Sequence, residues 1–181
     1  MIGACFSWFE QPEAVVLPKL EPVVVHAEPI NIEQLQFEQE EINCLATNIY
    51  FEARSEGETS QAAVAQVTVN RAKSKRFPNT ICGVVYQAEY SEWYLVNHNR
   101  LVPKRNRCQF SWYCDGKPDT IKDANAYAFA YALANDIYKG EYPKVVSDNT
   151  LFYHADYVKP TWAMTMAKHE QIGTHIFYNY Y

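Results

Sequence analysis

The sequence predicts an α+β fold that is mainly helical, with one domain over residues 31–181 and a small β element. Three long stretches have apolar residues at helical spacing, and two short aromatic stretches near the C-terminus alternate like strands. A chain of 181 residues is long enough to bury one full core. Residues 1–30 mix prolines with short apolar pieces and show no sustained period, which predicts a flexible N-terminal tail or linker.

The first expected helix begins at Asn31, whose side chain is a favourable N-cap, and ends near Gly57. Ile42, Leu45 and Ile49 fall at the spacing that lines one face of a helix. This face is therefore expected to pack in the core.

A second helix is expected to start near Thr59 or Ser60, to run through "AAVAQVTVNRA" and to stop before Pro78. The stretch "FPNTICGVVYQ" then predicts a turn followed by a short helix, with Asn79 or Thr80 as its cap.

The segment 88–119 lacks clean periodicity and holds the strongest turn signals, so we expect a long irregular lobe there. An Ala-rich helix follows and ends at Gly140, with apolar positions at Ala124, Tyr127, Ala128 and Tyr131. Beyond it, "TLFYHADYV" predicts a strand, Pro160 opens a short helix, and "HIFYNYY" predicts a final strand.

Composition and charge argue against several classes of function. A formal net charge of −5 without a strong basic cluster argues against nucleic-acid binding. No apolar run approaches the ~20 residues that span a bilayer, so we expect no membrane insertion. The histidines and cysteines show neither CxxC nor HExxH spacing, and no phosphate-binding loop is present, so we expect no metal and no other cofactor.

One carboxyl group has the features of a catalytic acid. In "NIYFEARSEGE", Glu52 stands one turn beyond Ile49 on the buried face. Burial and the negative end of the helix dipole both raise the pKa of a carboxyl group, which keeps it protonated and able to donate. The alternative is a structural pair with Arg54 or Arg71. Glu56 and Glu58, around the break before the next helix, are interpreted as caps of the incoming N-terminus.

Several motifs resemble the SleB-type cell-wall hydrolase family, which comprises spore-cortex-lytic enzymes and their relatives in bacteria and phages. They are "YFEARSE", "AVAQVTVNR", "FPNTICGVVY", "CQFSWYCDG" and "TLFYHADYVKPTW", and the resemblance spans about Glu41 to Tyr178. It implies a lysozyme-like catalytic domain, related to lytic transglycosylases, that acts on the glycan of peptidoglycan. It also implies that Glu52 is the catalytic acid.

The resemblance further implies that one glutamate is sufficient. Glu52 would protonate the glycosidic oxygen between N-acetylmuramic acid and N-acetylglucosamine and leave a 1,6-anhydromuramoyl end. If water intercepts instead, the same site is a muramidase, which a second carboxylate from Asp115 or Glu92 would favour; we interpret both as turn or surface groups. A zinc-dependent N-acetylmuramoyl-L-alanine amidase and a catalytically silent wall-binding module stay open as alternatives.

Substrate-binding residues are implied by the same motifs. Gln109 and Ser111 match a polar segment that the family brings opposite the glutamate. Tyr153 and His154 match a segment in which asparagine usually follows the tyrosine, and we interpret His154 as a hydrogen-bonded structural residue.

Four further residues are open between two roles. Trp112 and Trp162 are candidates for stacking on sugar rings or for core packing. Arg54 and Asn70 are candidates for substrate contact or for hydrogen bonding between the first two helices. We treat Arg54, Glu56 and Asn70 as supporting residues.

Disulfides between Cys108 and Cys114 and between Cys44 and Cys82 are expected, although four cysteines allow three pairings. Disulfides indicate action in the periplasm or outside the cell. No signal peptide is visible at the start of the sequence. A phage endolysin released through a holin pore, or a chain numbered from a shortened start, would account for that. We expect a monomer, because long glycan strands demand an open groove.

Overall fold

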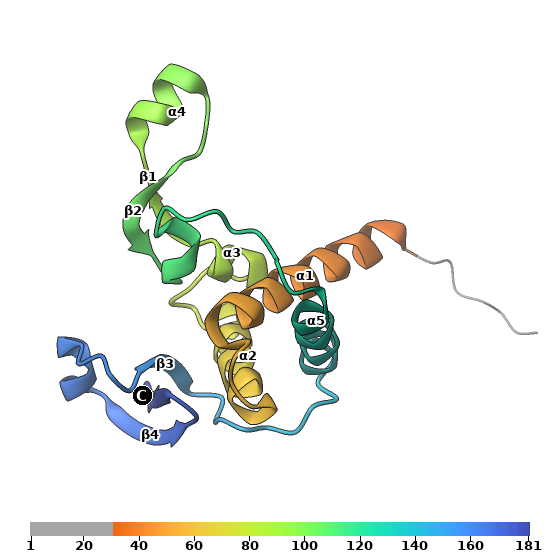
Figure 1. Cartoon of the computed structure of the whole chain (residues 1–181), viewed down its shortest axis with the longest axis vertical. Helices are drawn as coiled ribbons and strands as arrows, with labels where there is room; N and C mark the ends of the chain where they lie inside the picture. The colour runs from red at the N-terminus through yellow and green to blue at the C-terminus, as the bar shows by residue number, and fades with distance from the viewer. Residues whose placement is uncertain (1–30) are drawn as a thin grey trace, which may run out of the picture. The chain divides into compact units, whose positions relative to one another are not determined.

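The computed structural model describes residues 31–181, and the tail expected in residues 1–30 lies outside them. Four helices form the helical part: α1 (Ile32–Ala53), α2 (Glu58–Lys73), α3 (Ile81–Val85) and α5 (Ala124–Lys139). The helix α1 packs against the other three, so it forms the centre of this part (Figure 1). These elements confirm the three long helices and the short capped helix that the sequence predicts. No helix within residues 31–181 is long and apolar enough to cross a membrane.

The helix α1 begins and packs as its sequence predicts. The Asn31 side chain accepts a hydrogen bond from the backbone N–H of Gln34 at 3.2 Å, which satisfies one of the free donors of the first turn. Leu45 and Ile49 are completely buried. Glu52, in the last turn, is therefore carried to the edge of the core.

The helix α5 has the expected end but a different buried face. It is capped by Asp123 and ends at Gly140, which has the left-handed conformation that glycine readily adopts. Its buried residues are Ala130, Leu133, Ala134 and Ile137, whereas Ala124 and Ala128 are exposed. The expected apolar face was therefore right only in part, because Tyr127 and Tyr131 are partly buried and pack against the core. The sequence "ANAYAFAYALA" is apolar on every side, so its periodicity does not single out one face.

The expectation of an irregular lobe in 88–119 was also wrong. The lobe contains β1 (Ala88–Tyr90), α4 (Glu92–His98), β2 (Pro103–Cys108) and the 3-10 helix η1 (Ser111–Cys114). The strands β1 and β2 pair antiparallel with a register shift. Because β1 has three residues and β2 reads "PKRNRC", neither strand shows the alternation that would identify it from sequence.

Both expected disulfides are confirmed. Cys108–Cys114 closes the base of the lobe, and Cys44–Cys82 joins α1 to α3. The buried carboxylate of Glu41 reinforces the second junction, because it accepts the backbone N–H of Cys82 at 3.0 Å. The Cys44–Cys82 bridge therefore holds the short helix against α1, and Cys108–Cys114 ties β2 to η1 within the lobe.

The C-terminal part forms a three-stranded antiparallel sheet in the order β3-β5-β4. Its elements are β3 (Thr150–Ala155), the 3-10 helix η2 (Thr161–Thr165), β4 (Ala167–Ile172) and β5 (His175–Asn179). The expected first and last strands and the short helix after Pro160 are confirmed. The strand β4, which sequence reasoning did not predict, reads "AKHEQI" and is almost entirely exposed, so it lacks an apolar face.

Polar side chains of α2 hold the segment that leads into β3. Gln66 Nε2 donates to Pro143 O at 2.7 Å, Asn70 Nδ2 donates to Ser147 O at 2.9 Å, and Arg71 Nε donates to Leu151 O at 2.7 Å. All three side chains are largely buried. The sheet is thereby docked on the helix through its main chain.

Candidate active site

A cleft of about 1010 Å³ lies where the helices, the lobe and the sheet meet. The helices contribute Glu52 and Arg71. The lobe and its exit contribute Gln109, Ser111, Trp112 and Asp115, and the sheet side contributes Tyr153, His154, Trp162 and His175. Residues that are far apart in sequence and were predicted to act together thus share one cavity.

Glu52 is half-buried in this cleft and has one direct partner among residues 31–181. The hydroxyl of Tyr153, on β3, donates a hydrogen bond to Glu52 Oε2 at 3.0 Å. Burial raises the pKa of the Glu52 carboxyl group, and the Tyr153 hydrogen bond and the charge of Arg71 oppose this rise without cancelling it. The group therefore holds its proton to a higher pH than an ordinary glutamate, while a donor and a cation are in place for its carboxylate form.

Arg71 is the cation of the site, and sequence reasoning weighed it as a structural partner of Glu52 alone. Its side chain is 3 % exposed, and its guanidinium lies 5.3 to 5.9 Å from four aromatic ring centres, those of Phe77, Phe110, Phe152 and Tyr153. Nε bonds to Leu151 O, whereas Nη1 has no hydrogen-bond partner among residues 31–181. Arg71 lines the cleft, and its positive charge interacts with Glu52.

A second acidic group, Glu56, bonds to the turn between β4 and β5 and does not act as a helix cap. It accepts hydrogen bonds from Ser60 Oγ and from Thr174, whose backbone N lies at 3.1 Å and Oγ1 at 2.7 Å. Although burial opposes the change, these bonds lower the pKa of Glu56. The first turn of α2 instead begins at Gly57 without a side-chain cap, so the capping interpretation was wrong for Glu56. Glu58 does lie in that first turn, where its charge favours the helix N-terminus.

His175 links Glu56 to the catalytic region. Its Nδ1 lies 2.9 Å from Glu56 Oε1, and its ring packs edge-on against Tyr153 with ring centres 5.1 Å apart. Burial lowers the pKa of His175. Because its partner lies 119 positions away in the chain, no local pattern could have identified it.

The lobe residues reach the cleft as predicted. Gln109 and Ser111 both line it, and so does Asp115. Asp115 also makes a turn, since its carboxylate accepts the backbone N–H of Lys117 at 2.8 Å, and this bond lowers the pKa of Asp115. Glu92, on α4, is exposed and does not line the cleft.

The two tryptophans differ in their surroundings. Trp112 is 8 % exposed, stacks on Phe51 with ring centres 4.7 Å apart and donates from Nε1 to Asn48 Oδ1 at 3.0 Å, which is the environment of a core residue. Trp162 is half-buried and packs edge-on against His154. Of the two, Trp162 has more of its ring free for a ligand.

The structural interpretation of His154 agrees with its contacts, because Nδ1 lies 2.9 Å from Ala155 O and Nε2 lies 3.0 Å from the Tyr178 hydroxyl. Arg54 and Asn70 do not line the cleft and do not join the first two helices. Arg54 is exposed and donates to Tyr50 O of its own helix, whereas Asn70 bonds to the segment before β3. The expected bonding between the first two helices was wrong, because sequence positions do not show which strand packs on α2, whereas substrate contact by either residue stays a prediction.

Comparison with known proteins identifies similar chains. A family model described as Cell Wall Hydrolase matches residues 55–178, so the match begins three residues after Glu52. The chain is 30% identical over 149 residues to a spore cortex-lytic enzyme of Oceanobacillus iheyensis, covering 82% of this chain and 44% of that protein. It is 28% identical over 142 residues to a spore cortex-lytic enzyme of Bacillus cereus, covering 78% of this chain and 45% of that protein. The chain thus spans less than half the length of these curated relatives.

Among solved structures, the crystal structure of the catalytic domain of the Bacillus cereus SleB protein superposes with a TM-score of 0.55 at 27% identity. The similarity covers 78% of this chain and 91% of the solved domain. The likeness therefore extends over nearly all of a domain that is described as catalytic.

Proposed function

Because the chain belongs to the cell wall hydrolase family, we propose that it cleaves the glycan strands of peptidoglycan between N-acetylmuramic acid and N-acetylglucosamine, with Glu52 as the single general acid and base. The fold is lysozyme-like, as expected, and resembles that of the SleB catalytic domain. The cleft supplies the concave site that such a polymer needs.

One observation carries this proposal: Glu52 combines a raised pKa with a hydrogen-bond donor at its carboxylate and with the charge of Arg71 on the same cleft. The raised pKa keeps a proton available, and Tyr153 and Arg71 stabilise the negative charge that appears when the proton leaves. A carboxyl group with a purely structural role would gain from groups that stabilise its charge, but it would not gain from a raised pKa.

The reaction uses these groups in two steps. In the first, Glu52 gives its proton to the glycosidic oxygen as the bond from that oxygen to the muramic acid anomeric carbon breaks, with the 2-acetamido group assisting. In the second, the carboxylate of Glu52 takes the proton of the 6-hydroxyl of the same sugar, whose oxygen bonds to the anomeric carbon. The products are a free N-acetylglucosamine end and a 1,6-anhydromuramoyl end, which is the outcome of a lytic transglycosylase.

A muramidase is the second candidate, and the position of Asp115 favours it. Asp115 lines the cleft and has a lowered pKa, so it supplies an ionised carboxylate beside the same cavity as Glu52. Such a group is what a hydrolytic route needs to activate water. Asp115 also bonds to Lys117, which supports a role in holding the turn. If Asp115 only holds the turn, Glu52 acts alone and the transglycosylase route is favoured.

The test is mass spectrometry of the soluble products released from purified peptidoglycan by the wild type and by Glu52→Gln, with Glu58→Gln as a matched control at an exposed position outside the cleft. We expect anhydromuramoyl products from the wild type and from Glu58→Gln, and none from Glu52→Gln. Reducing muramic ends would make the protein a muramidase.

Other outcomes would reject the proposal. Full activity in Glu52→Gln would remove the acid from the mechanism. Stem peptides released in a chelator-sensitive reaction would indicate the amidase. Tight binding to intact, uncleaved glycan would indicate the wall-binding module.

The site of action proposed for this reaction is the periplasm or the cell exterior, as the sequence suggested. Two disulfides within the described residues support it, because such bonds persist in oxidising compartments. Release as a phage lysin through a holin pore remains part of this proposal.

A further inference from the structure

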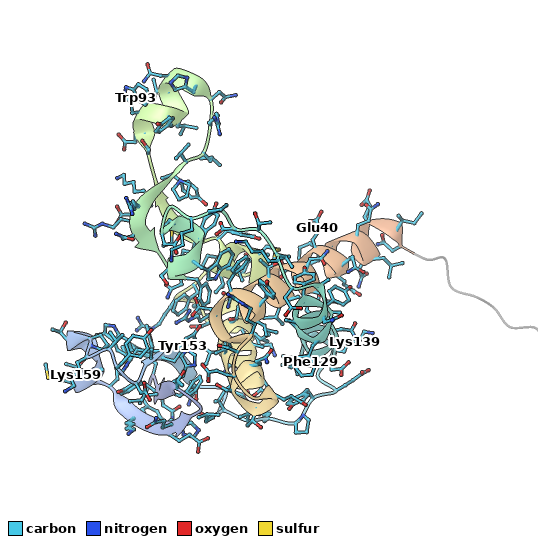
Figure 2. The ribbon with its side chains drawn as sticks, viewed as in Figure 1. Glu40, Trp93, Phe129, Lys139, Tyr153 and Lys159 are labelled. Atoms are coloured by element: carbon cyan, nitrogen blue, oxygen red, sulfur yellow. A yellow bond between two sulfur atoms is a disulfide. The ribbon has the colours of Figure 1, made fainter. Side chains whose placement is uncertain are left out.

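The tip of the lobe, defined as residues 92–101, is an exposed apolar surface outside the cleft. Every one of its ten residues is exposed, and α4 buries none of its side chains. Its large apolar members are Trp93, Tyr94, Leu95, Val96 and Leu101, of which Val96 is 81% and Leu101 66% exposed. Figure 1 shows α4 at the far end of the lobe, and Figure 2 shows Trp93 on it. Contiguous exposed apolar side chains of this kind mark an interaction surface.

The tip is held by its own hydrogen bonds and ring contacts. Ser91 N donates to Val102 O at 2.9 Å across its base, and Asn99 N donates to Leu95 O at 3.0 Å where α4 ends. The Trp93 ring packs against the rings of Tyr94 and His98, with centres 4.9 and 5.0 Å apart. The apolar side chains are therefore presented on an ordered support.

Basic side chains lie at the end of the tip, at Arg100, and on the strand β2 that follows it. Residues 88–108 carry Arg100, Lys104, Arg105 and Arg107 against the two carboxylates of Glu89 and Glu92, although the whole chain has a net charge of −5. The rest of the lobe adds Lys117 against Asp115 and Asp119. Glu89 lies within 3.6 Å of Lys104 and 4.0 Å of Arg107, whereas Arg100 and Arg105 form no ion pair among residues 31–181. With four cations against two carboxylates, the segment 88–108 has a formal net charge of +2 on a negative chain.

We propose that the tip docks on the surface of a lipid bilayer that contains anionic lipids. The apolar side chains would enter the interface between head groups and acyl chains, where tryptophan and tyrosine are favoured, and the basic side chains would contact the anionic head groups. This surface lies outside the cleft, so the proposal does not depend on the reaction assigned to Glu52.

Other partners fit this surface less well. Two copies meeting through their tips would bring like charges together, and an anionic wall polymer would match the cations but leave Val96 and Leu101 exposed to water. A neutral glycan accepts aromatic faces and has no use for the aliphatic side chains. A bilayer with anionic head groups matches both the apolar and the basic residues.

The experiment is co-sedimentation of the full 181-residue chain with vesicles of phosphatidylcholine alone or mixed with phosphatidylglycerol. The test variant is Val96→Asp, and the matched control is Met164→Asp, because Met164 is 84% exposed and lies on η2, away from the lobe. We expect the wild type and Met164→Asp to bind the anionic vesicles, with binding weakened by salt, and Val96→Asp to bind at least tenfold less well. Because both variants retain residues 1–30, a contribution from that segment would not separate them.

Several results would overturn the proposal. The first is that the wild type fails to bind anionic vesicles at low salt. The second is that Val96→Asp binds them as well as the wild type does, with an unchanged thermal transition. Self-association in sedimentation velocity without lipid, lost in Val96→Asp, would assign the tip to a second copy. Retention on purified peptidoglycan that depends on Val96, without vesicle binding, would assign it to the wall.

Discussion

Replacing Tyr153 with phenylalanine removes one atom from the site and tests how Glu52 is tuned. The Tyr153 hydroxyl donates to Glu52 Oε2 at 3.0 Å, so the change deletes the direct donor to the carboxylate and keeps the aromatic ring. Because this bond stabilises the charged form, its loss raises the pKa of Glu52 further. The protonated acid then persists to higher pH.

The size of this effect follows from the type of bond. A hydrogen bond to a charged group contributes about 1.5–3 kcal/mol, which corresponds to a roughly 10- to 150-fold change in an equilibrium constant. In a pH–rate profile of peptidoglycan solubilisation, the alkaline limb of Tyr153→Phe should therefore lie about one to two pH units above that of the wild type. On the plateau below this limb, the variant should react more slowly by up to the same factor, because the carboxylate that forms lacks its donor.

A matched control is available within the chain. The Tyr142 hydroxyl donates to Glu58 Oε1, also at 3.0 Å, outside the cleft, so Tyr142→Phe removes the same type of bond elsewhere. It should leave the pH–rate profile unchanged. An alkaline limb that stays in place or moves to lower pH in Tyr153→Phe would refute the assignment of Glu52 as the acid tuned by Tyr153.

Three predictions concern stability, each measured by denaturant unfolding. Gly173→Ala should lower the free energy of unfolding by about 1–3 kcal/mol more than Gly140→Ala does. Both glycines have positive φ, but a Cβ at Gly173 would overlap the Glu56 carboxylate, whereas Gly140 faces open space. Equal losses in the two variants would contradict this. Glu56→Gln should weaken the pH dependence of stability. A carboxylate with a lowered pKa stabilises the fold above its unfolded-state pKa, and this contribution is lost as pH falls through the folded-state pKa. An unchanged slope of unfolding free energy against pH would count against this prediction. Removing Cys44–Cys82, whose cysteines are 38 positions apart, should lower the free energy of unfolding by about 4 kcal/mol through chain entropy. Removing Cys108–Cys114 should cost less, because it closes a much shorter loop. A larger loss from Cys108–Cys114 would refute this prediction.

The sequence allowed prediction of those parts of the site that depend on one helix or one local motif. Glu52 could be placed because its spacing from Leu45 and Ile49, which are completely buried, identifies the side of α1 on which it lies. Tyr153 followed from the resemblance to a known family and from the alternating stretch around it. The α5 face could not be predicted, because alanines and aromatic residues surround that helix on all sides.

Contacts between distant segments account for what was missed. Arg71 belongs to the site because the lobe and the sheet bring aromatic rings around it, and a pattern within α2 contains no information about those rings. Glu56 precedes a helix, which favoured a cap, but its partner Thr174 lies 118 positions later and takes both of its oxygens. In each case tertiary packing overrode a reasonable local interpretation.

The attachment of the sheet to α2 has a consequence for how the protein can evolve. Gln66, Asn70 and Arg71 bind main-chain oxygens of the segment 143–151, and these oxygens are present whatever side chains the segment carries. Substitutions in that segment can therefore accumulate without moving the strand, whereas the three helix positions have little freedom to change. The position of Tyr153 therefore depends on α2. Its residues Asn70 and Arg71 lie 80 positions before the strand residues Thr150 and Leu151 whose main-chain oxygens they bind.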